Sequence, residues 1–506
     1  MPAPWPAGDS RQTKRDIRAR RYPRRTPSAG GCTRPANVVA ISGSTPRPAL
    51  RERLPREGNR LLHDEPLPLW VGFLALFSVV LARTPLLVNH HTGLWRITLT
   101  SAFVAGAIWA IPRRHPERVS IGVVRLVALY LLVIGVAMVR GANVGVYSTK
   151  TAVLDWLVLA SLALFGVAFC ASAQTARSLS TRLALVAYSP AAYVAANVFL
   201  RAARHALPFS LPVTSTDIQN GPDELLGLVG MHAARISFPL AQGLNNFGAI
   251  AGAGFAAAVM LSLRTRRPPR SLSALAAAVC FYGVLATDSR ATLFLALAVI
   301  VLFIVRRRIG AAKGLAVIIP LSPVIVLAGL SFAAGSGFLG HLSRQSGDLS
   351  TGNNRLYIWR AVFGVIRHAN EHLLFGYGGF GQIKSGVAYQ YAYLFGDSLA
   401  SQSHSAHNIA LQTILDSGYV GLLVLVAVVI AALRLLERSL RVIPHSAVQA
   451  AMALLLVTIL SGATEALPSY LFPDTLALFV FVLAAAAGSR LVSHDEEGGA
   501  ADTTRA

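Results

Sequence analysis

The residues best suited to chemistry lie in the segment His404-Ser405-Ala406-His407-Asn408, which directly precedes an apolar stretch. If the segment is helical, its two imidazoles share a face, because residues three apart are neighbours on a helix. Histidine titrates near neutral pH, so His407, with His404 as the second choice, can accept a proton from a hydroxyl as a general base. Asn408 can orient a substrate or cap the helix, and a polar helix start without chemistry is the alternative for the whole segment. No third Cys, Asp or Glu ligand lies at short spacing, so no metal site is predicted.

Three arginines outside the apolar stretches are candidates for binding an anion. Arg290 ends the very tight turn TDSR, Arg235 lies in a long connection, and Arg355 precedes Trp359 and Phe363 at four-residue spacing. A guanidinium stays charged at any relevant pH and binds phosphate oxygens bidentately, so these positions suit a ligand that carries phosphate. The structural alternatives are that the arginines extend to lipid headgroups and that the two aromatic residues anchor an interfacial helix.

Glycine and acidic residues near these candidates predict local features. The glycine-rich run 376–381 allows either a tight turn or a close backbone approach to an anionic ligand, and the turn is the simpler expectation. The sequence Asp416-Ser417-Gly418 interrupts an apolar stretch and predicts a broken helix, a feature that often lines polar cavities. Glu465, between the last two apolar stretches, is expected to be an exposed acid.

Apolar stretches must position these residues, because 54% of the 506 residues are hydrophobic and only 14% are charged. An ordinary soluble domain carries about 25% charged residues, so the composition excludes a soluble enzyme. About twelve stretches approach the roughly 20 residues that a helix needs to cross a bilayer. The predicted fold is therefore an all-α polytopic membrane protein with about twelve transmembrane helices in residues 67–491. The stretches cover 67–83, 95–111, 119–139, 151–173, 183–200, 244–263, 272–287, 291–305, 314–334, 408–433, 446–463 and 471–490.

The distribution of Lys and Arg orients these helices, since cytoplasmic loops retain basic residues. Alternate short loops are rich in arginine, whereas the short loops between them hold only Arg140, Lys150 and Arg290. Both termini are thus predicted to be cytoplasmic, in a multi-pass protein of the cytoplasmic (inner) membrane. They form a disordered basic tail over residues 1–66 and a short C-terminal tail over 492–506.

Two long connections, 201–243 and 335–407, then fall on the outer side, where loops carry function more often than the elements they join. The second contains an amphipathic pattern from Arg355 to Leu374, preceded by residues that can cap a helix and ended by Gly376. We therefore predict a helix that lies along the outer surface of the membrane.

The formal net charge of +23 would suggest a nucleic-acid partner in a soluble protein. Here most basic residues fall in the N-terminal tail and the inner loops, so the surplus reflects topology and no nucleic-acid partner is predicted. CxxC, HExxH and P-loop sequences are absent, so no cofactor is expected. Three cysteines are too few for a disulfide framework.

The order of these features along the chain is similar to that of one enzyme family. An arginine precedes one apolar stretch, Ser-Arg follows the next, and a large outer loop carries NNRLYIW, LFGYGGFG and His407-Asn408, with GYVG beyond. This order resembles the O-antigen ligase and O-antigen polymerase family of bacterial membrane glycosyltransferases. By motif the resemblance covers roughly residues 230–435, and by helix count it covers the whole membrane region.

The resemblance implies an inverting glycosyltransferase that uses an undecaprenyl-diphosphate-linked glycan as donor on the outer face of the membrane, without a cofactor, in cell-surface polysaccharide biosynthesis. The acceptor is a hydroxyl of a glycan, lipid or protein, and membrane lipids surround the helices. Because nucleotide sugars are not supplied outside the cytoplasmic membrane, a lipid diphosphate is a suitable activated leaving group, and arginines suit its charge. The sequence does not separate a ligase from a polymerase.

The residues receive roles on this basis. His407 is assigned as the catalytic base and Arg290 as the catalytic cation at the diphosphate, with Arg235 beside it. Arg355 is assigned to diphosphate or glycan binding, and His404 and Asn408 are further substrate-binding candidates.

A secondary transporter with twelve helices and a purely structural role are the alternatives from other classes. Transporters built from two halves are expected to show an internal repeat and ionisable groups near the membrane midplane. Neither feature is found in the sequence, because the acids of the apolar region lie near helix ends or breaks. An enzyme is therefore the favoured class.

Overall fold

The computed structural model describes residues 67–83, 92–111, 119–142, 144, 148–203, 225, 235–263, 269–305, 310–336, 354–368, 371–395, 405–440 and 445–490. Within these ranges the regular structure is helical and contains no strand, which agrees with the predicted all-α class. The predictions for both tails, for His404 and for much of the two long connections fall outside the described residues.

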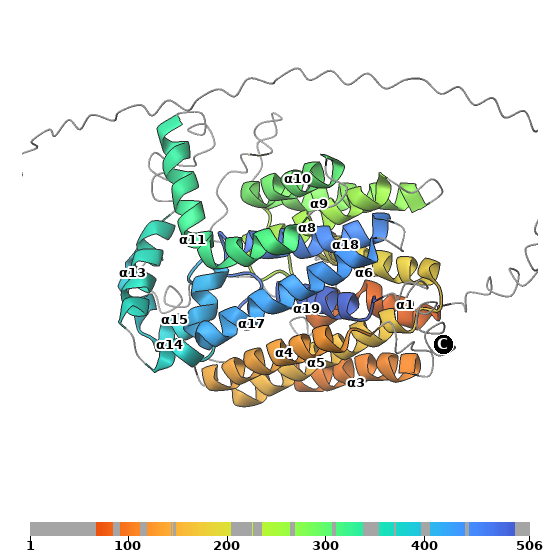
Figure 1. The fold of residues 1–506 in the computed structure, drawn as a ribbon, viewed down its shortest axis with the longest axis horizontal. Helices are drawn as coiled ribbons and strands as arrows, with labels where there is room; N and C mark the ends of the chain where they lie inside the picture. Colours follow the sequence, from red (N-terminus) through yellow and green to blue (C-terminus); the bar gives the residue numbers. More distant parts are fainter. Residues whose placement is uncertain are drawn as a thin grey trace, which may run out of the picture. The chain divides into compact units, whose positions relative to one another are not determined.

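Helices occupy every predicted apolar stretch (Figure 1). The first series comprises α1 (Leu69–Leu76), α2 (Ser78–Arg83), α3 (Thr92–Ala110), α4 (Ile121–Gly141), α5 (Thr149–Ala171) and α6 (Ala176–Ala202). The second comprises α8 (Leu244–Ser262), α9 (Pro269–Ala286), α10 (Arg290–Val305) and α11 (Ala311–Ser336). The last comprises α17 (Ile409–Ser439), α18 (His445–Ser461) and α19 (Pro473–Ala487).

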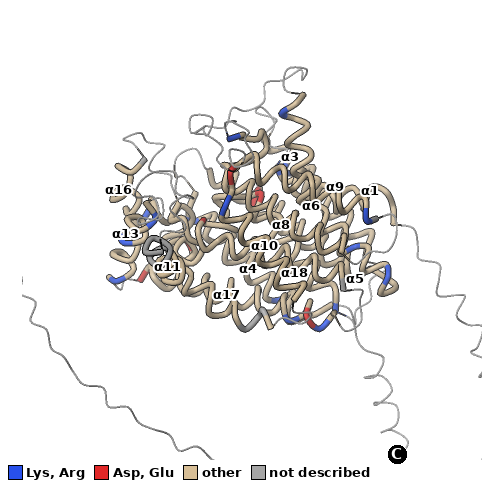
Figure 2. The backbone as a smooth tube through the Cα atoms, turned by 90° about the horizontal axis from the view of Figure 1, so that it is seen from above, with Lys and Arg blue, Asp and Glu red and all other residues tan. Residues whose placement is uncertain are grey.

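Five of these helices, α4, α5, α6, α8 and α17, are long and apolar enough to cross a membrane by length and composition. Shorter apolar helices accompany them in α9, α10, α11, α18 and α19. The chain is therefore a multi-pass membrane protein, whereas the total of about twelve transmembrane helices stays a prediction. Figure 2 shows that Lys, Arg, Asp and Glu lie mainly toward the helix ends.

Helix α8 is the central element for the candidate site, because it packs against α6, α9, α10 and α18. Its sequence is rich in Gly and Ala, and small residues let helix backbones approach closely. A Cβ atom at Gly254 would lie only 2.7 Å from Sγ of Cys280 on α9. At Gly252 a Cβ atom would overlap the side chain of Thr292 on α10. The small residues of α8 thus fix the positions of α9 and α10.

Helix α17 is broken at Gly418, as the sequence predicts. Gly418 has φ 69° and ψ −169°, a backbone conformation that only glycine adopts readily. Its missing side chain also makes room for Leu374, whose backbone would overlap a Cβ atom at position 418. The break therefore lets the segment after α13 pass close to the first part of α17.

Replacing Gly418 with alanine is expected to destabilise the protein by about 2 kcal/mol or more, because both the backbone conformation and the contact with Leu374 exclude a side chain. Thermal unfolding in detergent measures the effect. Gly122→Ala is the matched control, since no described atom lies within 4 Å of a Cβ atom added there. Equal unfolding temperatures for the two variants would contradict this account of the break.

The amphipathic helix predicted from Arg355 to Leu374 is shorter in the structure, which is a correction. Helix α13 (Arg355–Arg367) ends at His368, whose backbone is extended at φ −83° and ψ 90°. A separate turn, α14 (His372–Phe375), then leads to Gly376 at φ 71°. Three further short helices follow in α15 (Gly381–Lys384), α16 (Val387–Tyr391) and η7 (Ala392–Phe395).

Helix α13 runs crosswise to α17 near the beginning of α17 (Figure 1). Its apolar side, which includes Ile358, Trp359 and Val362, packs with α16 and with Leu411 and Leu415 of α17 in a separate hydrophobic cluster. The indole Nε1 of Trp359 donates a hydrogen bond of 2.9 Å to the carbonyl oxygen of Ala406. The aromatic residue of the predicted stripe is therefore buried, and it attaches α13 to the start of α17.

Candidate functional site

A buried carboxylate, that of Glu465, lies at the centre of the candidate site. Its Oε1 atom lies 2.5 Å from Nη2 of Arg355 and 2.8 Å from Nδ2 of Asn245. Its Oε2 atom lies 2.9 Å from Nδ1 of His407. Glu465 is only 8% exposed, so the expectation of an exposed acid was wrong. The carboxylate brings together two of the predicted site residues, Arg355 and His407.

Helix ends position each member of this cluster. Arg355 is the first residue of α13, and its Nε atom also donates to the carbonyl oxygen of Thr464 at 2.8 Å. His407 has a left-handed backbone with φ 48° just before α17 begins. Asn245 lies in the first turn of α8, and Glu465 follows the end of α18. Helices α8 and α17 begin, and α18 ends, at the same end of the bundle. We call this end the site end.

The charges around Glu465 keep it ionised. Burial by itself would raise the pKa of this carboxyl, but the charges of Arg355 and His407 and their hydrogen bonds outweigh burial. Together they lower the pKa of Glu465 from its usual 4.5 to about 2. Glu465 therefore acts as a fixed negative charge at neutral pH.

The ionised carboxylate determines the tautomer of His407. A carboxylate without a proton only accepts hydrogen bonds, so the Nδ1 atom of His407 must carry the hydrogen of their contact. In the neutral ring the basic lone pair then lies on Nε2. A carboxylate at Nδ1 also stabilises the imidazolium that forms when Nε2 takes up a proton, as in hydrolase triads. This geometry is the one that a general base with a defined tautomer requires.

Asn408 is the N-cap of α17. Its Oδ1 atom accepts hydrogen bonds from the backbone N–H groups of Ala410 and Leu411 at 2.9 and 3.1 Å. Its Nδ2 atom donates to the carbonyl oxygen of Ala463 and to the hydroxyl of Ser322 at 2.9 and 3.0 Å. Of the two roles open from the sequence, capping is the one seen in the structure. Contact with a substrate stays a prediction.

Arg290 is held in the tight turn between α9 and α10. Its Nε and Nη2 atoms lie 3.0 and 3.3 Å from the two carboxylate oxygens of Asp288, a bidentate pair. Asp288 is buried and has a left-handed backbone with φ 52°. The next residue, Ser289, packs so closely against Gly248 of α8 that a side chain at position 248 would overlap it. Ser289 before Arg290 and Thr292 after it both pack against glycines of α8, so the turn is fixed against that helix.

Arg235 lies beside the same turn. The backbone N–H of the next residue, Ile236, donates to the carbonyl oxygen of Ala286 at 2.7 Å, just before the turn begins. Asn245 and Gly248 are three residues apart on α8, so they share one face of the helix. Asn245 contacts Glu465 and Gly248 contacts the turn of Arg290. One face of the first turns of α8 therefore links the two arginine-containing segments to the cluster of Glu465.

A second buried polar network holds the start of α8 from another direction. The hydroxyl of Tyr193 donates to Oδ2 of Asp474 at 2.8 Å, and Nδ2 of Asn246 donates to Oδ1 of the same carboxylate. The hydroxyl of Thr475 donates to Oδ1 of Asn246 at 2.5 Å. The local sequence around Asn245 and Asn246 predicts neither of their acid partners, which lie more than 200 positions away.

The glycine-rich run 376–381 packs against α4 and α17. The backbone N–H of Gly379 donates to the carbonyl oxygen of Ala137 at 2.6 Å, and that of Gly378 donates to the carbonyl oxygen of Asp416 at 3.0 Å. Arg140 donates to the carbonyl oxygens of Phe375 and Gly376 at 3.0 Å each. Close packing of the backbone thus explains the glycines, in line with the expected turn.

Taken together, the structure is a helical membrane protein in which Arg355, His407 and Glu465 meet at the site end of the bundle. Among the described residues, no group of three or more His, Cys, Asp or Glu could hold a metal ion. The arrangement holds the imidazole of His407 and the guanidinium of Arg355 on one carboxylate.

Comparison with known families identifies the class more closely. Residues 275–426 match the family model described as O-antigen ligase. This match confirms the resemblance to the O-antigen ligase and polymerase family over these residues, and it supports a membrane glycosyltransferase activity of that type. The matched segment contains Arg290, Arg355 and His407, whereas Arg235 and Glu465 lie outside it. No curated protein matches the chain significantly.

Proposed function

We propose that this enzyme transfers a glycan from an undecaprenyl-diphosphate-linked donor to an acceptor hydroxyl on the outer face of the cytoplasmic membrane. The observation that carries the proposal is the Glu465 carboxylate, which bridges His407 and Arg355. This bridge supports a base with a defined tautomer next to a cation. Both are needed for a transfer that deprotonates a hydroxyl and releases an anion.

In the proposed reaction, Nε2 of His407 removes the proton of the acceptor hydroxyl as its oxygen forms a bond to the anomeric carbon of the donor sugar. The bond between that carbon and the diphosphate oxygen breaks, and undecaprenyl diphosphate leaves with the electron pair. A single displacement of this kind inverts the configuration at the anomeric carbon. Glu465 stabilises the imidazolium that forms on His407.

The arginines are assigned to the charge that grows on the leaving group. Arg290 is the proposed catalytic cation, and Asp288 holds its guanidinium in one orientation. Arg235 lies beside the same turn and is proposed to bind the diphosphate with it. Arg355 is assigned to the diphosphate or the glycan, and its bond to Glu465 also gives it a positioning role. His404 and Asn408 remain proposed substrate contacts, although its hydrogen bonds favour a positioning role for Asn408.

The location of the site on the outer side is also a proposal, supported by charge. The site end of the bundle is the end at which α17 begins, and Arg434 and Arg438 lie in the last turns of the same helix. Basic residues mark the cytoplasmic ends of membrane helices, which supports a site end on the outer side and both termini on the inner side. A donor that carries its own activated leaving group suits that side.

The direct test is turnover of the purified protein in detergent. The protein is incubated with undecaprenyl-diphosphate-linked oligosaccharide and a hydroxyl acceptor, and the products are identified by mass spectrometry. We expect a glycosylated acceptor and free undecaprenyl diphosphate in equal amounts, without a membrane gradient. A transporter would leave the donor intact, so that outcome would overturn the proposed function.

Arg290→Ala is expected to lower kcat/KM about a hundred- to a thousand-fold, because removal of one preorganised donor to a developing anion typically has that effect. Arg290→Lys keeps the charge but loses the bidentate geometry, so it is expected to restore only part of the activity. Release of undecaprenyl diphosphate measures the rate. Arg177→Ala, at an exposed position at the start of α6, is the control. Activity of Arg290→Ala within a few-fold of the wild type would remove Arg290 from the proposed site.

A further inference from the structure

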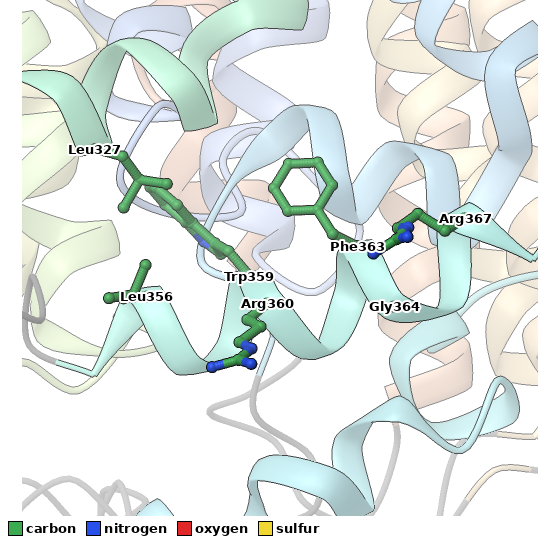
Figure 3. Close-up of a pocket in the computed structure, with 7 residues that line it drawn as sticks. All are labelled: Leu327, Leu356, Trp359, Arg360, Phe363, Gly364 and Arg367. Atoms are coloured by element: carbon green, nitrogen blue, oxygen red, sulfur yellow. The ribbon is translucent and has the colours of Figure 1, made fainter. Parts of the chain in front are cut away.

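A groove between α11 and α13 is not used by the proposed reaction. It encloses about 380 Å³ and is lined by Leu327 of α11 and by Leu356, Trp359, Arg360, Phe363, Gly364 and Arg367 of α13. Figure 3 shows Trp359 and Phe363 on the side of α13 that faces Leu327, whereas Arg360 extends away from that side. The groove thus combines an apolar floor with a basic rim.

The spacing of these residues on α13 separates the floor from the rim. Trp359 and Phe363 are four residues apart and share one face, and Arg360, Gly364 and Arg367 share the neighbouring face. No described atom lies within 4 Å of a Cβ atom added at Gly364. Because Gly364 has no side chain, a lipid in the groove can approach both Arg360 and Arg367 across this position.

The groove is continuous with an apolar surface of α11. Val317, Leu321, Val324 and Ile325 on that helix are between 46% and 58% exposed. In a multi-pass membrane protein, apolar side chains exposed in this way contact lipid acyl chains. Two prolines inside α11 disrupt its hydrogen bonding, and Figure 1 shows the helix bent. Lipid chains that cover α11 thus lie on the same helix as Leu327, which lines the groove.

The charge of α13 selects the kind of lipid. The helix contains Arg355, Arg360 and Arg367 and no acidic residue. Arg355 is engaged by Glu465, whereas Arg360 and Arg367 are exposed and form no ion pair with the described residues. Basic residues near a membrane surface attract anionic headgroups, each by about 1 kcal/mol. A zwitterionic lipid gains much less from the same pair.

We propose that the groove binds an acyl chain of an anionic phospholipid of the surrounding bilayer, with its phosphate between Arg360 and Arg367. The bilayer lipid is favoured over the glycan donor because, in the proposed function on which this choice rests, the donor's diphosphate is bound by Arg290 and Arg235. Trp359 forms the floor and donates to the carbonyl oxygen of Ala406, which directly precedes His407. The bound lipid therefore supports the packing of α13 against the start of α17. Its binding does not depend on the proposed reaction.

Quenching of tryptophan fluorescence by brominated lipids tests the proposal on the full chain. The protein is reconstituted in phosphatidylcholine nanodiscs that contain a minor fraction of either brominated phosphatidylglycerol or brominated phosphatidylcholine. The signal of Trp359 is the difference between the wild type and Trp359→Phe. Two basic residues predict a preference of about 25-fold for the anionic lipid, since each contributes a factor of about five.

Variants of Arg360, Arg367 and Gly364 test which residues determine the lipid preference. Arg360→Gln with Arg367→Gln is expected to abolish the preference, and Gly364→Leu is expected to reduce quenching by both lipids because its side chain extends into the open space at the edge of the groove. Arg434→Gln with Arg438→Gln, at the opposite end of α17, is the matched control and is expected to keep the full preference. Equal quenching by the two lipids, or a preference that survives the loss of Arg360 and Arg367, would overturn the proposal.

A second measurement avoids the Trp359 variant in case it does not fold. Native mass spectrometry of the wild type with equal amounts of phosphatidylglycerol and phosphatidylcholine is expected to show the anionic lipid retained, and Gly364→Leu is expected to retain less of it. Added undecaprenyl diphosphate is expected to leave the quenching unchanged. If it displaces the brominated lipid at stoichiometric amounts, the groove belongs to the donor and the assignment to a bilayer lipid is wrong.

Discussion

Replacing His407 with alanine is expected to lower kcat for glycan transfer about a hundred- to ten-thousand-fold, the range over which general bases contribute to enzymatic rates. The acceptor hydroxyl is a weak nucleophile until its proton is removed, and the Nε2 atom of His407 is oriented for this step by Glu465. Single-turnover release of undecaprenyl diphosphate measures the chemical step separately from substrate binding. The KM for the donor is expected to change much less than kcat.

A second substitution at this position separates chemistry from folding. His407 has φ 48°, a backbone conformation that asparagine tolerates better than alanine does. His407→Asn therefore keeps the backbone but has no basic nitrogen, and it is expected to be as inactive as His407→Ala. His368→Ala, at an exposed position after α13, is the control with unchanged activity. Near wild-type rates for His407→Asn would show that another group is the base.

Glu465→Gln is expected to lower kcat by a similar factor, because the substitution removes the charge that stabilises the imidazolium of His407. It also leaves the guanidinium of Arg355 without its anionic partner in a site where that side chain is only 17% exposed. Loss of one partner of a buried ion pair typically destabilises a protein by about 3 to 5 kcal/mol. Glycan transfer and thermal unfolding in detergent measure the two effects. Glu371→Gln, at a carboxylate that is 89% exposed, is the matched control.

The pH dependence of stability offers an independent check on Glu465. Its pKa in the folded protein is about 2, below its usual 4.5, so the folded state favours the ionised form. The resulting stabilisation is fully present above pH 4.5 and is lost as the pH falls from about 4.5 to 2. The difference in unfolding temperature between the wild type and Glu465→Gln is therefore expected to shrink as the pH falls below 4.5. A difference that does not change with pH would contradict the ion pairs.

Local patterns in the sequence were sufficient to predict the helices but not to predict Glu465 as the centre of the candidate site. Hydropathy predicts the helical stretches, and Asp416-Ser417-Gly418 predicts the break in α17, because both depend on neighbouring residues. Glu465 lies 110 positions from Arg355 and 58 from His407, so its pairing depends on how α18 packs against α8 and α17. Its burial could not be inferred from a single acid between two apolar stretches.

The end of α13 shows a second limit of sequence patterns. Apolar spacing continues from Arg355 to Leu374, yet the helix ends at Arg367. The segment after it must reach Gly376 and Gly418, where the backbones of two chain segments nearly touch. Tertiary contact with α17 and α4 therefore overrides the helical pattern. The family model also ends at residue 426, before Glu465, so the match does not supply the missing acid.

The neighbouring residues Asn245 and Asn246 point in different directions around the axis of α8, because successive helical residues are separated by about 100°. One side chain is tied to Glu465 and the other to Asp474. Two anchors at different azimuths prevent the helix from rolling about its own axis as well as from shifting along it. In the proposed reaction, the separation between the turn of Arg290 and His407 then stays constant while one glycosidic bond forms. The rest of a long glycan would extend away from these two residues, so under the proposed function the length of the transferred polymer is not measured between them.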